Sequence, residues 1–170
     1  MNWKIGIITA SDSISKGERE DDRIDILRRL IFEYLKTDNI IYRSVPDDME
    51  ELKEHMIELV DREKVDLLVV TGGTGLSPRD VTPEVTKWVI DRQVPGLAEE
   101  MRRAGLQQSR RAMLTRAVAG TRGNSLIVNV PGNPRGVEIC FTAIADMLPD
   151  ALHILQGTEE SSEDWGGLGW

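Results

Sequence analysis

Apolar and polar positions along the chain form blocks that predict strands and helices in turn. Short apolar runs typical of buried strands occur at residues 3–10, 40–45, 65–70 and 124–130. Apolar residues recur every three to four positions, as in helices that pack on a sheet, over residues 24–35, 49–60, 82–90, 95–105 and 135–148. This alternation predicts an α/β fold, a three-layer αβα sandwich with a mostly parallel sheet.

Polar and turn residues stand where these strands end. Four segments share this pattern: "TASDS" (9–13), "VPDD" (45–48), "TGGTG" (71–75) and "VPGNP" (130–134). In open α/β sheets, ligands bind beyond the carboxyl ends of the strands. We therefore expect the four segments to share one rim that holds a ligand.

The glycine-rich segment is the most informative of the four. Gly72, Gly73 and Gly75 let backbone N–H groups approach an anion without obstruction by side chains. A tight turn would need one or two glycines, so the loop favours a phosphate cradle over a plain turn. Its spacing matches neither a dinucleotide-binding fingerprint nor a P-loop.

Two carboxylates flank this loop in the sequence. Asp80 lies between two prolines, and Asp47 follows the second strand. Carboxylates beside a phosphate need a cation between them, which predicts Mg²⁺. For Asp47 the alternative is a helix cap, because Glu50 completes a capping box. Asp48 and Glu51 form a second such box.

The other two rim segments also have structural alternatives. Asn133 and Pro134 have the pattern of a helix cap followed by its preferred first residue. Ser11 and Asp12 can form a turn or bind a ligand. Cys140 falls among apolar helix positions, as expected of a small buried residue and not of a nucleophile.

Charge and composition exclude some classes of protein. A formal net charge of −8 argues against a nucleic-acid binder. No apolar run approaches the roughly 18 residues of a membrane helix, and the N-terminus lacks the pattern of a secretory signal, so we expect a cytoplasmic protein. Half of the net charge lies in residues 157–170, which predicts an acidic, flexible tail after a domain over residues 1–156. Residues 101–123 hold six arginines and no acid, either a solvated or subunit-contact face or a site for an anionic ligand.

Taken in order, "TASDS", "VPDD", "TGGTGLSPRDVTPE", "VPGLAEEMR", "LTRAVAGTRG" and "NVPGNPRGVEICF" resemble the molybdopterin adenylyltransferase family, MogA/MoaB, which includes the G domain of gephyrin. The resemblance covers roughly residues 3–155. It implies a role in molybdenum cofactor biosynthesis, the Mg²⁺-dependent transfer of AMP from ATP to the terminal phosphate of molybdopterin with release of pyrophosphate.

The resemblance also implies site residues and partners. Asp47 and Asp80 match the family's catalytic and Mg²⁺-binding acids. The implied substrate-binding residues are Ser11, Asp12, Gly72, Gly73, Thr74, Gly75, Ser77, Glu99, Pro131, Gly132 and Asn133. The family further implies a homotrimer or homohexamer, with molybdenum insertase and molybdopterin synthase as partners.

The chain departs from the family pattern near its first helix. Arg23 and Ile24 stand where the family usually has a serine and a glycine, in "DDRIDILRR". Bulk there would narrow the pocket or change a ligand contact. The alternative function is accordingly a non-catalytic molybdopterin carrier or scaffold of the MoaB type.

Overall fold

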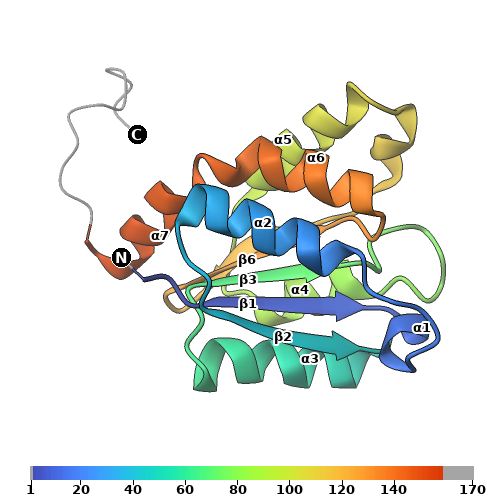
Figure 1. Cartoon of the computed structure of the whole chain (residues 1–170), viewed down its shortest axis with the longest axis horizontal. Helices are drawn as coiled ribbons and strands as arrows, with labels where there is room; N and C mark the ends of the chain where they lie inside the picture. The colour runs from blue at the N-terminus through green and yellow to red at the C-terminus, as the bar shows by residue number, and fades with distance from the viewer. Residues whose placement is uncertain (1, 159–170) are drawn as a thin grey trace.

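The middle layer of the protein is a six-stranded sheet. The computed structural model describes residues 2–158. Its strands are β1 (Ile5–Ala10), β2 (Ile40–Val45), β3 (Leu67–Thr71), β4 (Arg92–Gln93), β5 (Ala119–Arg122) and β6 (Ser125–Val130). In the order β2-β1-β3-β6-β5-β4, the first four strands are parallel, β5 is antiparallel to β6, and β4 is antiparallel to β5. This confirms the mostly parallel sheet (Figure 1).

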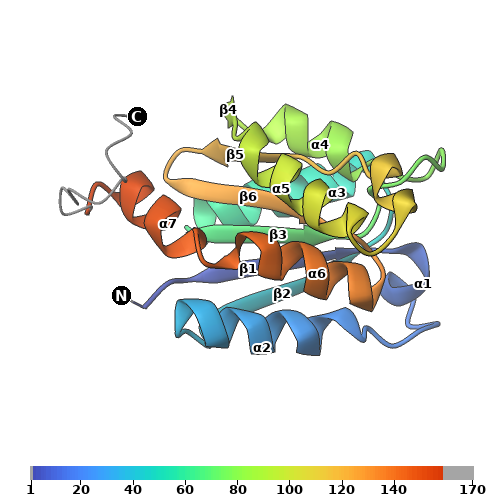
Figure 2. The ribbon, with the colours of Figure 1, turned by 90° about the horizontal axis from the view of Figure 1, so that it is seen from above.

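Helices cover both faces of the sheet. They are α1 (Asp12–Ser15), α2 (Arg23–Leu35), α3 (Met49–Ile57), the π-helix η1 (Glu58–Arg62), α4 (Thr82–Val89), α5 (Pro95–Leu106), the 3₁₀-helix η2 (Arg110–Leu114), α6 (Pro134–Ala145) and α7 (Leu148–Gln156). Seen from above, α2, α5 and α6 lie over one face, and α3 and α4 lie beneath the other (Figure 2). The predicted three-layer αβα sandwich is therefore confirmed.

The central strands β1, β3 and β6 are mostly apolar because both of their faces are buried. In β1, Ile5 and Ile7 belong to the core under α2, α5, α6 and α7, and Ile8 and Ala10 belong to the core over α3 and α4. Side chains alternate between the two faces of a sheet, so a strand between two helical layers needs apolar residues at every position. The same alternation holds in β3 and β6.

The sequence did not predict β4, β5 or the break between α6 and α7. β4 has two residues, and β5 reads "AGTR", so neither carries an apolar run. The predicted helix over 135–148 is wrong in length, because α6 ends at Ala145 and a separate helix begins at Leu148. Pro149 has no N–H to donate to the preceding turn, so it belongs in the first turn of a new helix.

Two helix caps bear on the alternatives that the sequence left open for Asp47 and Asn133. The Asp48 side chain accepts a hydrogen bond from Glu51 N at 3.0 Å, so Asp48 caps α3 and the capping interpretation of Asp47 is wrong. Asn133 caps α6, accepting from Gly136 N at 2.7 Å.

The helical part of the chain ends close to the predicted domain boundary. α7 ends at Gln156, and Gly157 follows in the left-handed conformation with a φ of 64°. The predicted tail lies, from residue 159 on, outside the described residues. Among the helices of residues 2–158, none has the length and apolar character needed to cross a membrane.

Candidate functional site

The four polar segments meet at one edge of the sheet, as predicted. Because β1, β2, β3 and β6 are parallel, their carboxyl ends lie at the same side, where α1 and the neighbouring loops gather (Figure 1). Ser11 N donates to Val45 O at 2.9 Å, which joins the first two segments. Gly72 N donates to Val130 O at 3.2 Å, which joins the other two.

Asp12 and Asp47 bind each other's backbone across this rim. Asp47 N donates to Asp12 Oδ1 at 2.9 Å, and Asp12 N donates to Asp47 Oδ2 at 3.2 Å. The second Asp12 oxygen accepts from Arg79 Nη2 at 2.6 Å. Hydrogen bonds from Arg79, and then from the Asp47 backbone, lower the pKa of Asp12. Asp12 is thus an ionised carboxylate whose charge is paired with Arg79.

Among residues 2–158, no arginine binds the Asp47 carboxylate. Its Oδ1 is buried and has no hydrogen-bond partner among residues 2–158. Burial raises the pKa of Asp47, and together with the charges of Asp12 and Asp80 it outweighs the lowering effects of the Asp12 N–H and of Arg79. A buried carboxylate oxygen without a donor is a fitting place for a cation.

Mg²⁺ fits this arrangement only with help from a ligand. Within residues 2–158, no group of three or more His, Cys, Asp or Glu side chains is placed to hold a metal ion. Asp47 and Asp80 can therefore supply part of a coordination sphere, and phosphate oxygens and water would supply the rest. Mg²⁺ commonly binds proteins in this way, through one or two carboxylates and substrate phosphates.

The glycine loop passes too close to other groups to carry side chains. Gly72 has a φ of +95°, and a Cβ there would lie 2.4 Å from Ala10 O. Gly73 has a φ of +66°, and its Cβ would lie 2.5 Å from Thr82 Oγ1 and 3.3 Å from Asp47 Oδ1. Both positions require glycine because of their backbone conformation and the lack of space.

Thr82 lies beside this loop at the start of α4, where Val81 occupies the cap position. The Thr82 hydroxyl is buried and has no partner within residues 2–158. Thr82 N donates to Gly73 O at 3.1 Å, so this residue closes the glycine loop through its backbone.

Asp80 closes a short loop that Arg116 clamps. Ser77 N donates to Asp80 Oδ2 at 3.0 Å, and Asp80 N donates to Ser77 O at 2.9 Å. Arg116 donates from Nε to Gly75 O at 2.8 Å and from Nη2 to Asp80 O at 2.9 Å. Its Nη1 also binds the Glu84 carboxylate. One arginine therefore fixes both ends of the segment that carries Asp80.

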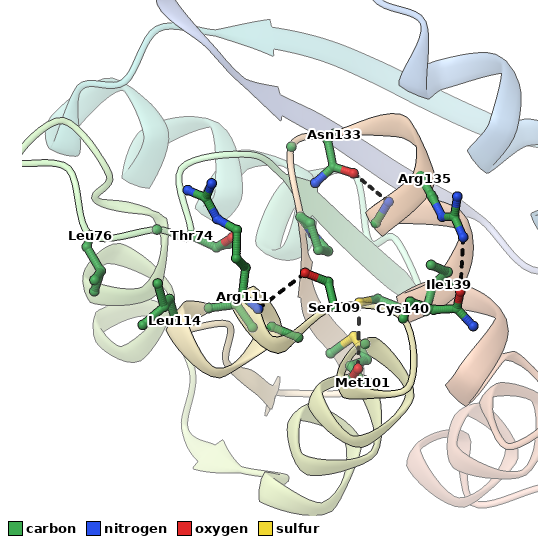
Figure 3. A pocket seen from close by; sticks show the side chains of 18 of the residues that line it. Thr74, Leu76, Met101, Ser109, Arg111, Leu114, Asn133, Arg135, Ile139 and Cys140 are labelled. Atoms are coloured by element: carbon green, nitrogen blue, oxygen red, sulfur yellow. Dashed lines mark hydrogen bonds between the residues drawn. The ribbon is translucent and has the colours of Figure 1, made fainter.

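A pocket of about 630 Å³ opens beside this loop (Figure 3). Six of the predicted substrate-binding residues line it: Thr74, Gly75, Ser77, Pro131, Gly132 and Asn133. In Figure 3, Leu76 and Leu114 lie on one side of the pocket, and Asn133 and Arg135 lie on the other. Arg111 and Arg135 give the lining a cationic character suited to an anionic ligand.

The remaining predicted residues have other positions. Ser11, Asp12, Gly72, Gly73, Asp47 and Asp80 form the rim described above. Ser11 also caps α1, since its hydroxyl accepts from Ile14 N at 3.4 Å. Glu99 is exposed on α5 and is not one of the residues that line the pocket.

Sequence reasoning missed several residues that build the site. Arg79 and Arg116 bind rim residues, and Arg111 lines the pocket. Arg116 and Arg111 belong to the arginine-rich stretch for which two alternatives were open, and Arg79 is the Arg of "SPRD". Cys140 also lines the pocket, but burial raises its pKa to about 11, so it is a poor nucleophile at neutral pH.

Comparison with known proteins agrees with this architecture. The family described as "Probable molybdopterin binding domain" matches residues 6–150. A molybdopterin adenylyltransferase from Helicobacter pylori strain J99 is 37% identical over 154 residues, which cover 90% of this chain and 88% of the relative. The Drosophila melanogaster molybdenum cofactor synthesis protein cinnamon is 35% identical over 150 residues, 88% of this chain. The chain spans only 25% of the length of cinnamon.

A solved structure extends the likeness to three dimensions. The molybdopterin biosynthesis enzyme MoaB from Thermus thermophilus superimposes with a TM-score of 0.86 at 42% sequence identity. The match covers 91% of this chain and 97% of that one. Fold and family, as expected from the sequence motifs, are both confirmed.

Proposed function

Because the chain belongs to the molybdopterin-binding family of molybdenum cofactor biosynthesis, we propose that it transfers AMP from ATP to the terminal phosphate of molybdopterin and releases pyrophosphate. The observation that carries this proposal is that the Asp47 oxygen without a partner in residues 2–158 lies at the same rim as a cationic pocket. Phosphoryl and nucleotidyl transfer need an anion cradle beside carboxylates that can hold a cation.

Molybdopterin is assigned to the pocket between the glycine loop and the loop after β6. Thr74, Gly75 and Ser77 line it from the glycine loop, and Gly132 and Asn133 line it from the loop after β6. A volume of about 630 Å³ suits a ligand of this size. Its terminal phosphate would then point toward the glycine loop and the two carboxylates.

The reaction needs no nucleophile from the protein. A terminal phosphate oxygen of molybdopterin forms a new bond to the α-phosphorus of ATP, and the bond from that phosphorus to the bridging α,β-oxygen breaks, so that pyrophosphate leaves. Asp47 and Asp80 would hold Mg²⁺, which when bound neutralises charge on the phosphates. The protein contributes positioning: Arg116 fixes the Asp80 loop, and Asp12 fixes Asp47.

Assembly, partners and location are part of the proposal. We place the protein in the cytoplasm as a homotrimer or homohexamer that passes its product to a molybdenum insertase and receives molybdopterin from its synthase. Family resemblance supports these assignments. Multi-angle light scattering of the purified chain tests the assembly, and a monomeric mass would contradict it.

The test of the proposed function is pyrophosphate release from ATP and Mg²⁺ with and without molybdopterin. We expect release only when molybdopterin is present. Asp80→Asn should abolish it without altering the circular dichroism spectrum. Asp150→Asn, at an exposed position on α7, is the matched control and should retain full activity. Molybdopterin binding without pyrophosphate release would instead identify a non-catalytic carrier.

A further inference from the structure

Arg23, the residue that departs from the family pattern, lies inside the protein next to the site. It is the first residue of α2, and only 2% of its surface is exposed. Its Nε donates to Asp21 Oδ1 at 3.2 Å, and its Nη1 donates to Gly132 O at 3.0 Å. Its Nη2 is buried and has no hydrogen-bond partner within residues 2–158. The side chain thus crosses from the start of α2 to the loop after β6.

Asp21 anchors the guanidinium to the sheet. Asp21 Oδ2 accepts from Thr9 Oγ1 at 2.5 Å and from Tyr42 Oη at 2.6 Å. Thr9 belongs to β1 and Tyr42 to β2. Burial works against the ionised form of Asp21, but these donors and Arg23 outweigh it, and its pKa is lowered. Arg23 therefore has a rigid, ionised partner on its inner side.

On its outer side, Arg23 contacts the place where two pocket loops touch. A Cβ on Gly132 would lie 3.1 Å from Arg23 Nη1 and 3.2 Å from Gly72 Cα. A Cβ on Gly72 would lie 3.0 Å from the same Nη1. The guanidinium is packed behind both glycines, and Gly132 lines the pocket from its other side.

Stability alone does not account for this arrangement. A buried ion pair recovers its desolvation energy only when every polar atom is satisfied, and a buried pair is weak evidence of stabilisation. Arg23 leaves Nη2 without a partner among the described residues, so its buried charge is incompletely satisfied. The position of Arg23 is better explained by the bond from its Nη1, which fixes the orientation of the Gly132 peptide.

We propose that Arg23 is a positioning residue of the pocket: it ties the Gly132 carbonyl to the Asp21, Thr9 and Tyr42 network and so holds the Gly132–Asn133 wall in its ligand-binding conformation. This inference rests on the proposed function for the identity of the ligand. Ile24, the other departing residue, has an ordinary structural role, since it packs against the core under α2.

The experiment compares Arg23→Lys with Arg29→Lys. Lysine keeps a cation beside Asp21, but its single ammonium group cannot reproduce the planar pair of hydrogen bonds to Asp21 Oδ1 and Gly132 O. Arg29 lies on the same helix, pairs with Glu138 at the surface and is the matched control. Hydrogen exchange of peptides spanning residues 131–137 is measured without ligand. We expect exchange about tenfold faster in Arg23→Lys than in the wild type or in Arg29→Lys, with the rest of the sheet unchanged.

Kinetics with molybdopterin and ATP supply the second readout. Arg23→Lys should raise the KM for molybdopterin about tenfold and leave the KM for ATP within about threefold. Tyr42→Phe loosens the same network from its other end and should produce a smaller, equally local rise in exchange. Because exchange requires no turnover, an inactive wild type would overturn the proposed function without affecting this test. The positioning role would be overturned if Arg23→Lys and Tyr42→Phe both exchanged at residues 131–137 as slowly as Arg29→Lys. It would also be overturned if exchange were faster to the same degree in all elements.

Discussion

Asp12 and Asp47 accept hydrogen bonds from each other's backbone N–H, at 2.9 and 3.2 Å respectively, and this exchange fastens the loop after β1 to the loop after β2. The two carboxylates differ in the partner of their second oxygen. Asp12 pairs with Arg79, whereas Asp47 Oδ1 is buried without a partner among the described residues. The charge of Asp47 is therefore free to act on a ligand or cation.

Removal of that charge should separate function from stability. We expect Asp47→Asn to lower pyrophosphate release by at least about a hundredfold, because a bound cation loses a carboxylate. Its free energy of unfolding should be equal to or greater than that of the wild type, because an uncompensated buried charge is removed. Urea denaturation and the pyrophosphate assay check both parts.

The neighbouring residue is the matched control. Asp48→Ala removes the cap of α3 and should lower the free energy of unfolding by about 1 kcal/mol while leaving turnover unchanged. Asp47→Asn with normal turnover would exclude Asp47 from the mechanism.

The raised pKa of Asp47 predicts a distinctive pH dependence. In the unfolded chain the group ionises near its ordinary pKa of 3.8, and in the folded protein it ionises at higher pH. As the pH rises through that interval, the wild type should lose stability relative to Asp47→Asn, and the difference should vanish below the interval, where both side chains are neutral. Asp12 and Asp21, whose pKa values are lowered, stabilise both proteins above their ordinary pKa and so do not create this difference. Urea unfolding from about pH 3 to about pH 7 measures it, and a gap that grows toward acid would contradict it.

Apolar periodicity predicted the part of the fold that depends on burial. The central strands β1, β3 and β6 lie between two helical layers, so their mostly apolar runs were clear in the sequence. β4 and β5 pair at the edge through backbone hydrogen bonds, which need no apolar side chains, and were therefore missed. One continuous helix was expected over 135–148, and the break before Leu148 was signalled only by Pro149.

The rim was predictable because strand ends are visible in sequence, but the arginines were not. Asp80 and the glycines stand in one short motif, whereas Arg116 reaches Gly75 and Asp80 from 41 and 36 residues further along the chain. A side chain that binds backbone carbonyls leaves no local pattern, since any loop supplies such acceptors. Arg23 was noticed as a departure from the family motif, and its burial follows from contacts with Asp21 and Gly132 that spacing does not show.

The close approach of Gly72 to Ala10 can be tested by substitution, with Gly17 as the control. Gly72 and Gly17 both have positive φ, +95° and +73°. A Cβ at Gly72 would lie 2.4 Å from Ala10 O, whereas a Cβ at Gly17 would meet nothing within 4 Å. Gly17→Ala should therefore lower the free energy of unfolding by about 1 kcal/mol, from backbone strain alone, and Gly72→Ala by about 3 kcal/mol or more. Urea denaturation measures both, and equal losses would show that the loop can move away from Ala10.

The clamp of Arg116 on the Asp80 loop can be tested by proteolysis. Arg79 is exposed in this loop and is therefore a trypsin site. Because trypsin needs a locally opened chain, the rate of cleavage after Arg79 reports how often the loop opens. Lysine at position 116 has one ammonium group and cannot bind both Gly75 O and Asp80 O in the planar geometry of arginine.

We expect Arg116→Lys to speed cleavage after Arg79 about fivefold or more and to lower kcat/KM about tenfold, because Asp80 loses its fixed position. Arg103→Lys, which changes an exposed pair with Glu100 on α5, should alter neither quantity. If cleavage after Arg79 were as slow in Arg116→Lys as in Arg103→Lys, the loop would be held by the Ser77 and Asp80 hydrogen bonds alone, and Arg116 would act chiefly through Glu84.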